Sequence, residues 1–148
     1  SLWAGRAPGL PLGDPYQALI LASIVQKEGA PPAEQAHIAA VFLNRLRQGM
    51  PLQSDPTVIY ALGERYTGLL TPQEMHVESP YNTYLHTGLP PTPIAMPGLS
   101  SLMAVLHPAD SADLYFIAQG DEYHYSESYT KHLEQIQRYL QHAGGAGL

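Results

Sequence analysis

The 148-residue chain contains no cysteine. This absence excludes a disulfide framework and any metal site built on thiolates, and it leaves the redox compartment open. Seven His residues are present, but none forms an i,i+4 pair and no His-Glu-x-x-His motif occurs. A Gly-x-Ser-x-Gly elbow is missing too, which argues against a Ser nucleophile. We therefore expect no metal, no cofactor and no acyl-transfer triad.

Positive charge and long apolar runs are also scarce. Seven Lys and Arg stand against 13 Asp and Glu, for a net charge of -6 without a basic cluster. This balance argues against nucleic acid and against anionic lipid as partners. No apolar run approaches the roughly 20 residues of a membrane span, and the first eight residues lack the layout of a signal peptide. Any targeting segment is therefore expected to lie outside this sequence, or not to exist.

The size and pattern of the chain predict one α+β domain that is rich in helix. With 45% hydrophobic residues, 148 residues suffice for one core. Residues 1–13 are expected to form a leader, 14–142 the catalytic domain, and 143–148 a flexible tail. The apolar and capping patterns predict helices over 15–28, 33–48, 55–63 and 100–106, and one that begins at Thr71. A last helix is predicted from an apolar stripe of Leu133, Ile136 and Leu140. A hairpin is predicted over 114–118 and 123–125, and a long Pro-rich loop over 79–98.

Glu28 is the first candidate for chemistry. It follows the apolar run Ala18–Val25 and directly precedes Gly29, so it should lie where a buried helix stops. Desolvation at such a place raises the pKa of a carboxyl group, which suits a proton donor. Taken alone, however, an acid at a helix end is more often simply solvated.

Two polar segments further along the chain are candidates for binding. In the first, Asp55 is interpreted mainly as a helix N-cap, while its neighbours could line a sugar-binding site or stabilise the turn through hydrogen bonds. In the second, two Tyr rings and an amide suit stacking on sugars, and equally suit a turn anchored in the core. The candidate residues are Gln53, Ser54, Asp55, Thr57, Tyr81, Asn82, Thr83 and Tyr84.

Five separated segments together resemble one known family. They are Ala22–Glu28 (ASIVQKE), Val41–Leu46 (VFLNRL), Leu52–Val58 (LQSDPTV), Tyr81–Tyr84 (YNTY) and Gly88–Pro91 (GLPP). Their order and wording resemble the catalytic domain of the endolytic murein transglycosylases, the MltG or YceG-like family, from about Tyr16 to Leu140. Five segments in the right order are far more specific than any single motif.

The resemblance implies a peptidoglycan lyase. Such an enzyme cuts the β-1,4 bond from N-acetylmuramic acid to N-acetylglucosamine without water, leaves a 1,6-anhydro ring, and acts in cell-wall assembly. The family's catalytic acid corresponds to Glu28. The substrate would be peptidoglycan glycan strands, with wall-synthesis proteins as possible partners. The full-length protein would be held in the cytoplasmic membrane by an N-terminal anchor outside this sequence, with this domain in the cell envelope.

Two departures from the family pattern affect the residue assignments. The second acid that often precedes the catalytic Glu is Gln26 here, so Glu28 is the sole acid of its motif. Near the C-terminus the family's first His is replaced by Tyr123, with His124 one place along. Because a one-residue slip in a strand reverses the side-chain face, His124 is not expected to inherit that role. His132 matches the pattern and is added to the substrate-binding candidates.

Two other functions remain open. A hydrolase of the same bond would need a second carboxylate, such as Asp55 or Glu64, to activate water. A silent peptidoglycan-binding or scaffold module would keep the fold without turnover. Since a fold alone does not imply activity, the site itself has to discriminate among the three.

Overall fold

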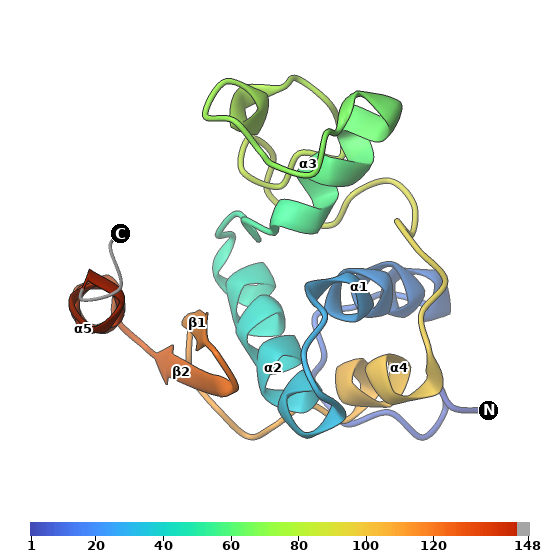
Figure 1. Ribbon diagram of the computed structural model, residues 1–148. Coiled ribbons are helices and arrows are strands. Elements are labelled where there is room, and N and C mark those ends of the chain that lie inside the picture. The colour runs from blue at the N-terminus through green and yellow to red at the C-terminus, as the bar shows by residue number, and fades with distance from the viewer. Residues whose placement is uncertain (145–148) are drawn as a thin grey trace.

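The computed structural model describes the backbone of residues 1–144 and the side chains of residues 1–141. Three helices, α1 (Pro15–Glu28), α2 (Pro32–Gln48) and α4 (Leu99–Leu106), pack on one another as the helical body (Figure 1). Above the body lies a segment that we call the cap, residues 53–92, with α3 (Asp55–Leu62) and two 3-10 turns, Gly63–Arg65 and Glu74–His76. This arrangement leaves the end of α1 facing the beginning of α3.

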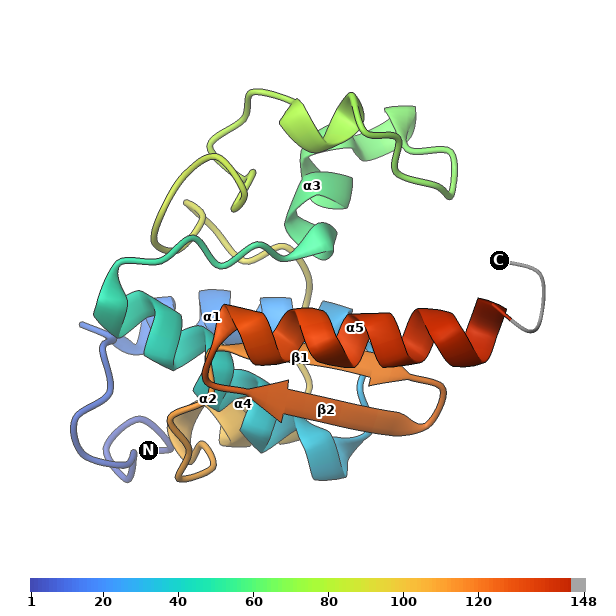
Figure 2. The ribbon, with the colours of Figure 1, turned by 90° about the vertical axis from the view of Figure 1, so that its left-hand side faces the viewer.

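A two-stranded antiparallel hairpin and the last helix lie on the side of α2 opposite α1 and α4 (Figures 1 and 2). Strand β1 (Tyr115–Gln119) pairs with β2 (Glu122–Ser126), with Phe116 opposite Tyr125 and Ile117 opposite His124. Gly120, in the two-residue turn, has a φ of 61°, which suits a tight hairpin turn. Helix α5 (Tyr129–Gly144) packs on the hairpin. The predicted α+β class with a small hairpin is confirmed.

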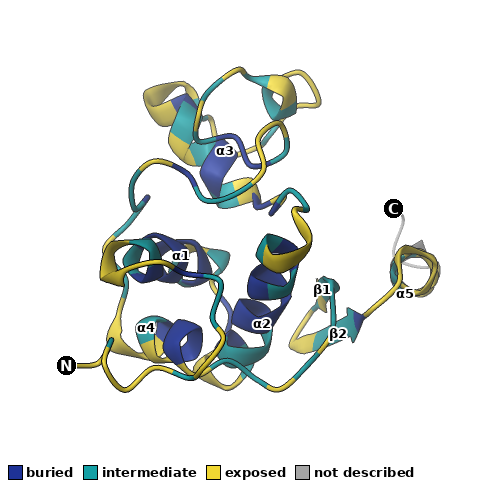
Figure 3. Cartoon of the chain, turned by 180° about the vertical axis from the view of Figure 1, so that it is seen from behind, coloured by how far each residue is buried: buried dark blue, intermediate teal, exposed yellow. Residues whose placement is uncertain are grey.

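The core lies between the facing sides of α1, α2 and α4 (Figure 3). Leu21, Ile24 and Val25 of α1 are fully buried there, as are Ile38 and Leu43 of α2. The hairpin joins this core through Phe116, whose ring meets Phe42 edge-on at 5.9 Å. Residues 1–13 contain turns and pack on the body, with the Ala7 amide donating to Leu106 O at 2.9 Å.

The predicted limits of the first two helices are confirmed to within one residue. The Asp14 carboxylate caps α1 by accepting from the Gln17 amide at 2.9 Å. Gly29 and Gly49, with φ of 75° and 68°, end α1 and α2 in the left-handed conformation that glycine adopts without strain. Glu28 is thereby fixed as the last residue of α1.

The helix predicted from Thr71 onward is wrong, since only the 3-10 turn Glu74–His76 forms. The capping box itself is present, with the Glu74 amide donating to Thr71 Oγ1 at 3.1 Å. However, Asn82 Nδ2 donates to Met75 O and Val77 O, the carbonyls that the next helical turn would have used. Pro80 also has no N–H to offer. The hydrogen bonds from the buried Asn82 amide therefore take the place of the backbone hydrogen bonds that would extend the helix.

The Pro-rich segment 79–98 is irregular, as predicted, and it is held by side chains of α1. Ser23 Oγ accepts from the Ile94 amide at 3.0 Å, and Gln26 Oε1 accepts from the Gly98 amide at 2.8 Å. The predicted flexible tail, 143–148, overlaps the end of α5, and its residues 145–148 lie outside the described residues.

Candidate active site

A cavity of about 290 Å³ lies between the end of α1, the second half of α2, the cap, the hairpin and α5. It brings together five of the predicted site residues: Glu28, Gln53, Asp55, Tyr84 and His132. The other residues that line it are Val41, Phe42, Arg45, Leu52, Leu114, Tyr115, Phe116 and Tyr129. Acid, phenol, imidazole and guanidinium groups thus meet above an apolar floor.

Glu28 enters this cavity from the last turn of α1, above the buried side chains of Ile24 and Val25. Ser54 Oγ donates a hydrogen bond to Glu28 Oε2 at 2.7 Å. Ser54 is itself 1% exposed, so its hydroxyl has little freedom. This bond occupies one carboxyl oxygen and leaves Oε1 as the position for a proton.

Burial raises the pKa of Glu28 from its ordinary 4.5 to about 7. The hydrogen bond from Ser54 acts in the opposite direction, and the negative charge of Asp55 adds a smaller upward shift to the pKa. Near neutral pH the group is therefore present in both its protonated and ionised forms. A carboxyl group in that balance can give up a proton and take one back.

The segment that carries Ser54 has an unusual backbone. Gln53 has a φ of 54°, the only non-glycine residue with positive φ among residues 1–144. Its amide donates to Thr83 O at 3.2 Å, and the next amide, of Ser54, donates to Thr83 Oγ1 at 2.9 Å. Thr57 Oγ1 in turn donates to Ser54 O at 2.7 Å. The left-handed residue and the two threonines aim Ser54 at Glu28.

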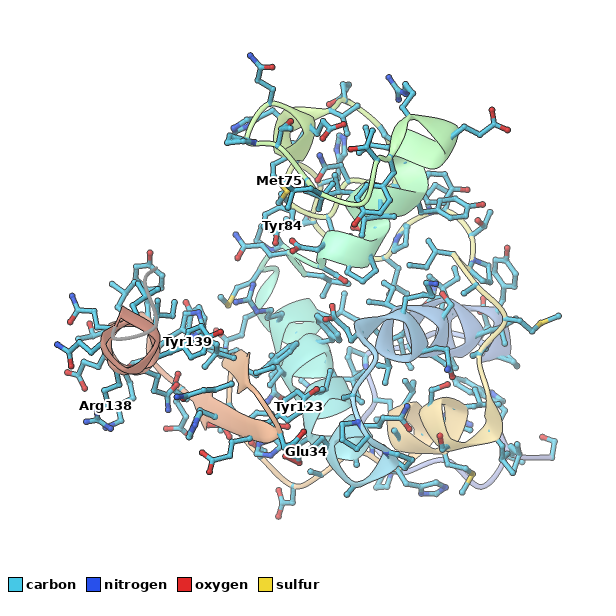
Figure 4. All side chains as sticks on the ribbon, in the orientation of Figure 1. Glu34, Met75, Tyr84, Tyr123, Arg138 and Tyr139 are labelled. Atoms are coloured by element: carbon cyan, nitrogen blue, oxygen red, sulfur yellow. The ribbon has the colours of Figure 1, made fainter. Side chains whose placement is uncertain are left out.

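Asp55 is not the N-cap of α3, which corrects the interpretation from sequence. Ser54 occupies the N-cap position without a side-chain cap bond, and Asp55 is the first helical residue. The Asp55 carboxylate instead accepts a hydrogen bond from the Tyr84 hydroxyl, in the cap beside α3 (Figure 4). Burial and this bond to Asp55 raise the pKa of Tyr84. The phenol therefore stays protonated and fixes the carboxylate at the cavity wall.

Five predicted binding residues lie outside the cavity lining: Ser54, which bonds to Glu28, and Thr57, Tyr81, Asn82 and Thr83. Asn82 is fully buried and organises the cap through its amide, with Oδ1 accepting from the Tyr84 amide at 2.9 Å. The Tyr81 hydroxyl is 2.7 Å from Thr92 Oγ1, and its ring packs on Tyr60 with centroids 4.8 Å apart. In this structure their contacts hold the cap, including Ser54 and Tyr84, in place.

His124 in β2 and His132 in α5 have different positions. His132 lines the cavity, and its ring stacks on Tyr115 with centroids 5.0 Å apart. Burial and the positive charge of Arg45 lower the pKa of His132. His124 lies outside the cavity lining, with Nε2 3.5 Å from Glu122 Oε2, whereas Tyr123 packs toward α2 (Figure 4).

Sequence reasoning missed Arg45 and the aromatic wall of Tyr115 and Tyr129. The aromatic residues come from the hairpin and α5, and no local pattern relates them to Glu28. Arg45 had a detectable signal, because it continues the buried helical spacing of Ile38 and Phe42 with a charged residue. Gln26, another polar residue of the Glu28 motif, lies outside the cavity lining, and its Oε1 also accepts from Ser101 Oγ at 3.0 Å.

The residues that line this cavity lie within a sequence segment that matches a known protein family. The model of the YceG-like family matches residues 4–138. The chain belongs to the YceG-like family. The family assignment from the five sequence segments is thereby confirmed.

Named relatives and a solved structure agree with the family. The chain is 40% identical over 126 residues to an endolytic murein transglycosylase of Bacillus subtilis (strain 168), covering 84% of this chain and 35% of the relative. It is 36% identical over 110 residues to one of Streptococcus pneumoniae serotype 2, covering 72% and 20%. A yceG-like protein of Listeria monocytogenes, with a 2.6 Å crystal structure, superposes with a TM-score of 0.74 at 43% identity, covering 80% and 38%.

The chain spans about a third or less of the length of these relatives. What the longer proteins do as a whole is therefore not transferred with the family. Within residues 1–144, no helix has both the length and the apolar character needed to cross a membrane.

Proposed function

We propose that this chain is the catalytic domain of an endolytic lytic transglycosylase that cuts the β-1,4 bond between N-acetylmuramic acid and N-acetylglucosamine in peptidoglycan. The observation that carries the proposal is Glu28, with a pKa of about 7, hydrogen-bonded by Ser54 at 2.7 Å and facing a cavity. Relatives named endolytic murein transglycosylase support the substrate and the reaction class.

In the first step, protonated Glu28 donates its proton to the glycosidic oxygen. Because Ser54 Oγ donates to Oε2, the proton resides on Oε1, the oxygen left free to meet the leaving group. Bond breaking then gives positive charge to C1 of the muramic residue, as in other glycosidases. The fraction of Glu28 that is protonated near neutral pH makes this step possible there.

In the second step, ionised Glu28 accepts the proton of the muramic C6 hydroxyl as that oxygen closes on C1. The product is a 1,6-anhydro ring, and Glu28 returns to its protonated form. One carboxyl group thus serves as acid and then as base, so no nucleophilic water is consumed. A pKa near the working pH favours both transfers equally.

Four other predicted residues are proposed to contact the sugar from the cavity wall: Gln53, Asp55, Tyr84 and His132. Tyr115 and Tyr129 supply aromatic surface on which a pyranose ring can pack. Ser54 acts through Glu28 and is a positioning residue. We assign Thr57, Tyr81, Asn82 and Thr83 the role of holding the cap, since they lie outside the cavity lining and their polar groups bond to one another or to other groups of the cap.

Hydrolysis of the same bond is the strongest rival, because Asp55 lines the cavity with Glu28 and could activate water. Glu64 is a weaker candidate, since it is exposed in the turn Gly63–Arg65 and does not line the cavity. Digestion of purified glycan in water labelled with heavy oxygen separates the reactions. Unlabelled anhydro ends are expected, whereas labelled reducing ends would make the enzyme a hydrolase.

A silent wall-binding module would bind the glycan and release no fragments. This outcome is detected in the same digestion when glycan binding is measured in parallel.

We further propose that the protein works in the cell envelope, held in the cytoplasmic membrane by a segment outside this sequence and acting beside wall-synthesis proteins. The relatives' names support the envelope, and fractionation of cells that carry the full-length protein tests the anchor.

A further inference from the structure

Arg45 is a buried cation in the wall of the same cavity. It comes from the last turn of α2 and is only 6% exposed. Its Nε donates to Leu114 O and its Nη1 to Pro51 O, both at 2.7 Å, and Nη1 also reaches Gln53 Oε1 at 3.4 Å. These contacts fix the plane of the guanidinium group between the hairpin and the start of the cap.

The donors of Arg45 are not all used. A guanidinium group has five N–H donors, and the three bonds above account for Nε and Nη1. Within the part of the chain that the structure describes, neither a hydrogen bond to Nη2 nor an ion pair to Arg45 is found. The guanidinium group lies over the Tyr115 ring, whose centroid is 4.9 Å away. Burying a cation without a carboxylate is costly, so a ligand is expected to supply the missing acceptor.

The substrate class proposed above offers such an acceptor. N-acetylmuramic acid differs from N-acetylglucosamine only by a lactyl group on the oxygen of C3. That group ends in a carboxylate in peptide-free strands and in an amide carbonyl where a stem peptide is attached. Any site that cuts after the muramic residue, and spares the other bond of the same strand, has to read this group.

We propose that Nη2 of Arg45 binds the terminal oxygen of the lactyl group and so selects muramic acid for the subsite beside Glu28. Among the described residues that line the cavity, Arg45 is the only Lys or Arg side chain, and the lowered pKa of His132 keeps that group uncharged near neutral pH. Arg45 is thus a specificity-determining residue. This inference rests on the proposed function, which supplies the substrate.

The first test varies the ligand and leaves Arg45 intact. Glu28→Gln protein, in which cleavage is blocked, is titrated with three tetrasaccharides: a peptide-free muramic form, a peptide-bearing muramic form, and one of N-acetylglucosamine alone. Both muramic forms are expected to bind at least about 10-fold more tightly, as suits a hydrogen bond to a charged group. Only the peptide-free form should weaken with added salt, because only its lactyl group is charged. Equal binding of all three would overturn the inference.

The second test varies the protein in the same background. Arg45→Gln should reduce both muramic affinities to that of the N-acetylglucosamine oligomer and leave the latter unchanged. Arg45→Lys, which keeps the charge, should retain part of the preference and serves if the first variant does not fold. The matched control is Arg47→Gln, because Arg47 is exposed, bonds to Asn44 Oδ1 and Gly9 O, and does not line the cavity.

A purely structural role for Arg45 would appear as an equal loss of affinity for all three ligands, and that result would overturn the inference. Failure of the proposed catalytic function has a different signature. The wild-type protein would then release no fragments from wall glycan, while the preference for muramic ligands and its dependence on Arg45 would persist.

Discussion

The hydroxyl of Ser54 donates to Glu28 Oε2 across 2.7 Å, joining the start of α3 to the end of α1. The two residues are 26 positions apart in the chain, and both are held by local backbone features: the left-handed cap at Gly29 and the left-handed conformation of Gln53. The cap therefore does more than cover the body. It sets the orientation and the proton affinity of the carboxyl group.

Replacing Ser54 with Ala should therefore impair catalysis and move its pH dependence. The Ser54 bond lowers the pKa of Glu28, so its loss should raise that pKa above about 7. The limb of the kcat profile that requires protonated Glu28 should shift to higher pH, while kcat at its maximum falls about 10-fold or more through lost orientation. Ser101→Ala, at a hydroxyl bonded to Gln26 outside the cavity lining, is the control and should leave the limb in place. An unmoved limb in Ser54→Ala would show that the Ser54 bond does not affect the pKa of Glu28.

Asp55→Asn should shift the same limb in the opposite direction. The negative charge of Asp55 raises the pKa of Glu28, so removing it should lower that pKa and move the protonated limb to lower pH. Asparagine can still accept from the Tyr84 hydroxyl, which limits structural change. Glu64→Gln removes an exposed acid of the cap and is the matched control. If Asp55→Asn abolished turnover at every pH and the wild type gave reducing ends, Asp55 would be the base of a hydrolase.

Glu28→Gln should unfold at higher denaturant than the wild type above neutral pH. The folded-state pKa of about 7 exceeds the ordinary 4.5. At pH values between these two, Glu28 is therefore more protonated in the folded protein than in the unfolded chain. The contribution of Glu28 to stability is therefore present below pH 4.5, is lost as the pH rises through 7, and is constant beyond. By this linkage the variant should gain up to about 3 kcal/mol at pH 8 and little at pH 4. Urea titrations at both pH values measure it, and a loss of stability at pH 8 would indicate a paired or solvated Glu28.

Asn82→Ala should lower the free energy of unfolding by about 2 to 3 kcal/mol, because Met75 O, Val77 O and the Tyr84 amide lose a buried partner. Asn82→Asp should also destabilise the protein, since an ionised carboxylate cannot donate to the two carbonyls. Urea unfolding at neutral pH is the measurement. A variant of unchanged stability with a raised KM would instead place Asn82 in contact with substrate.

The helices and their ends could be predicted because their signals are local. Asp14 and Gly29 bracket α1 with a side-chain cap and a left-handed residue, and that same signal placed Glu28 at a helix end. Thr71 and Glu74 also form the predicted capping box, yet Asn82 takes the carbonyls that a longer helix would need. A local signal thus predicts the start of a helix better than its length.

The candidate site could be predicted only in part, because it is built from distant elements. Gln53, Asp55 and Tyr84 do reach the cavity, whereas Thr57 and Asn82, from the same segments, face the interior of the cap. Residue type alone does not separate these two orientations. The capping interpretation of Asp55 failed for a similar reason, since its partner, Tyr84, is 29 positions away.

The most direct test of Glu28 as the single acid is mass spectrometry of the fragments released from purified wall glycan. The wild-type chain, Glu28→Gln and the control Glu34→Gln, which changes a partly buried acid outside the cavity lining, are compared at neutral pH. Anhydromuramic ends are expected from the wild type and the control, and none from Glu28→Gln. Anhydro ends from Glu28→Gln at the wild-type rate would show that Glu28 is not the catalytic acid.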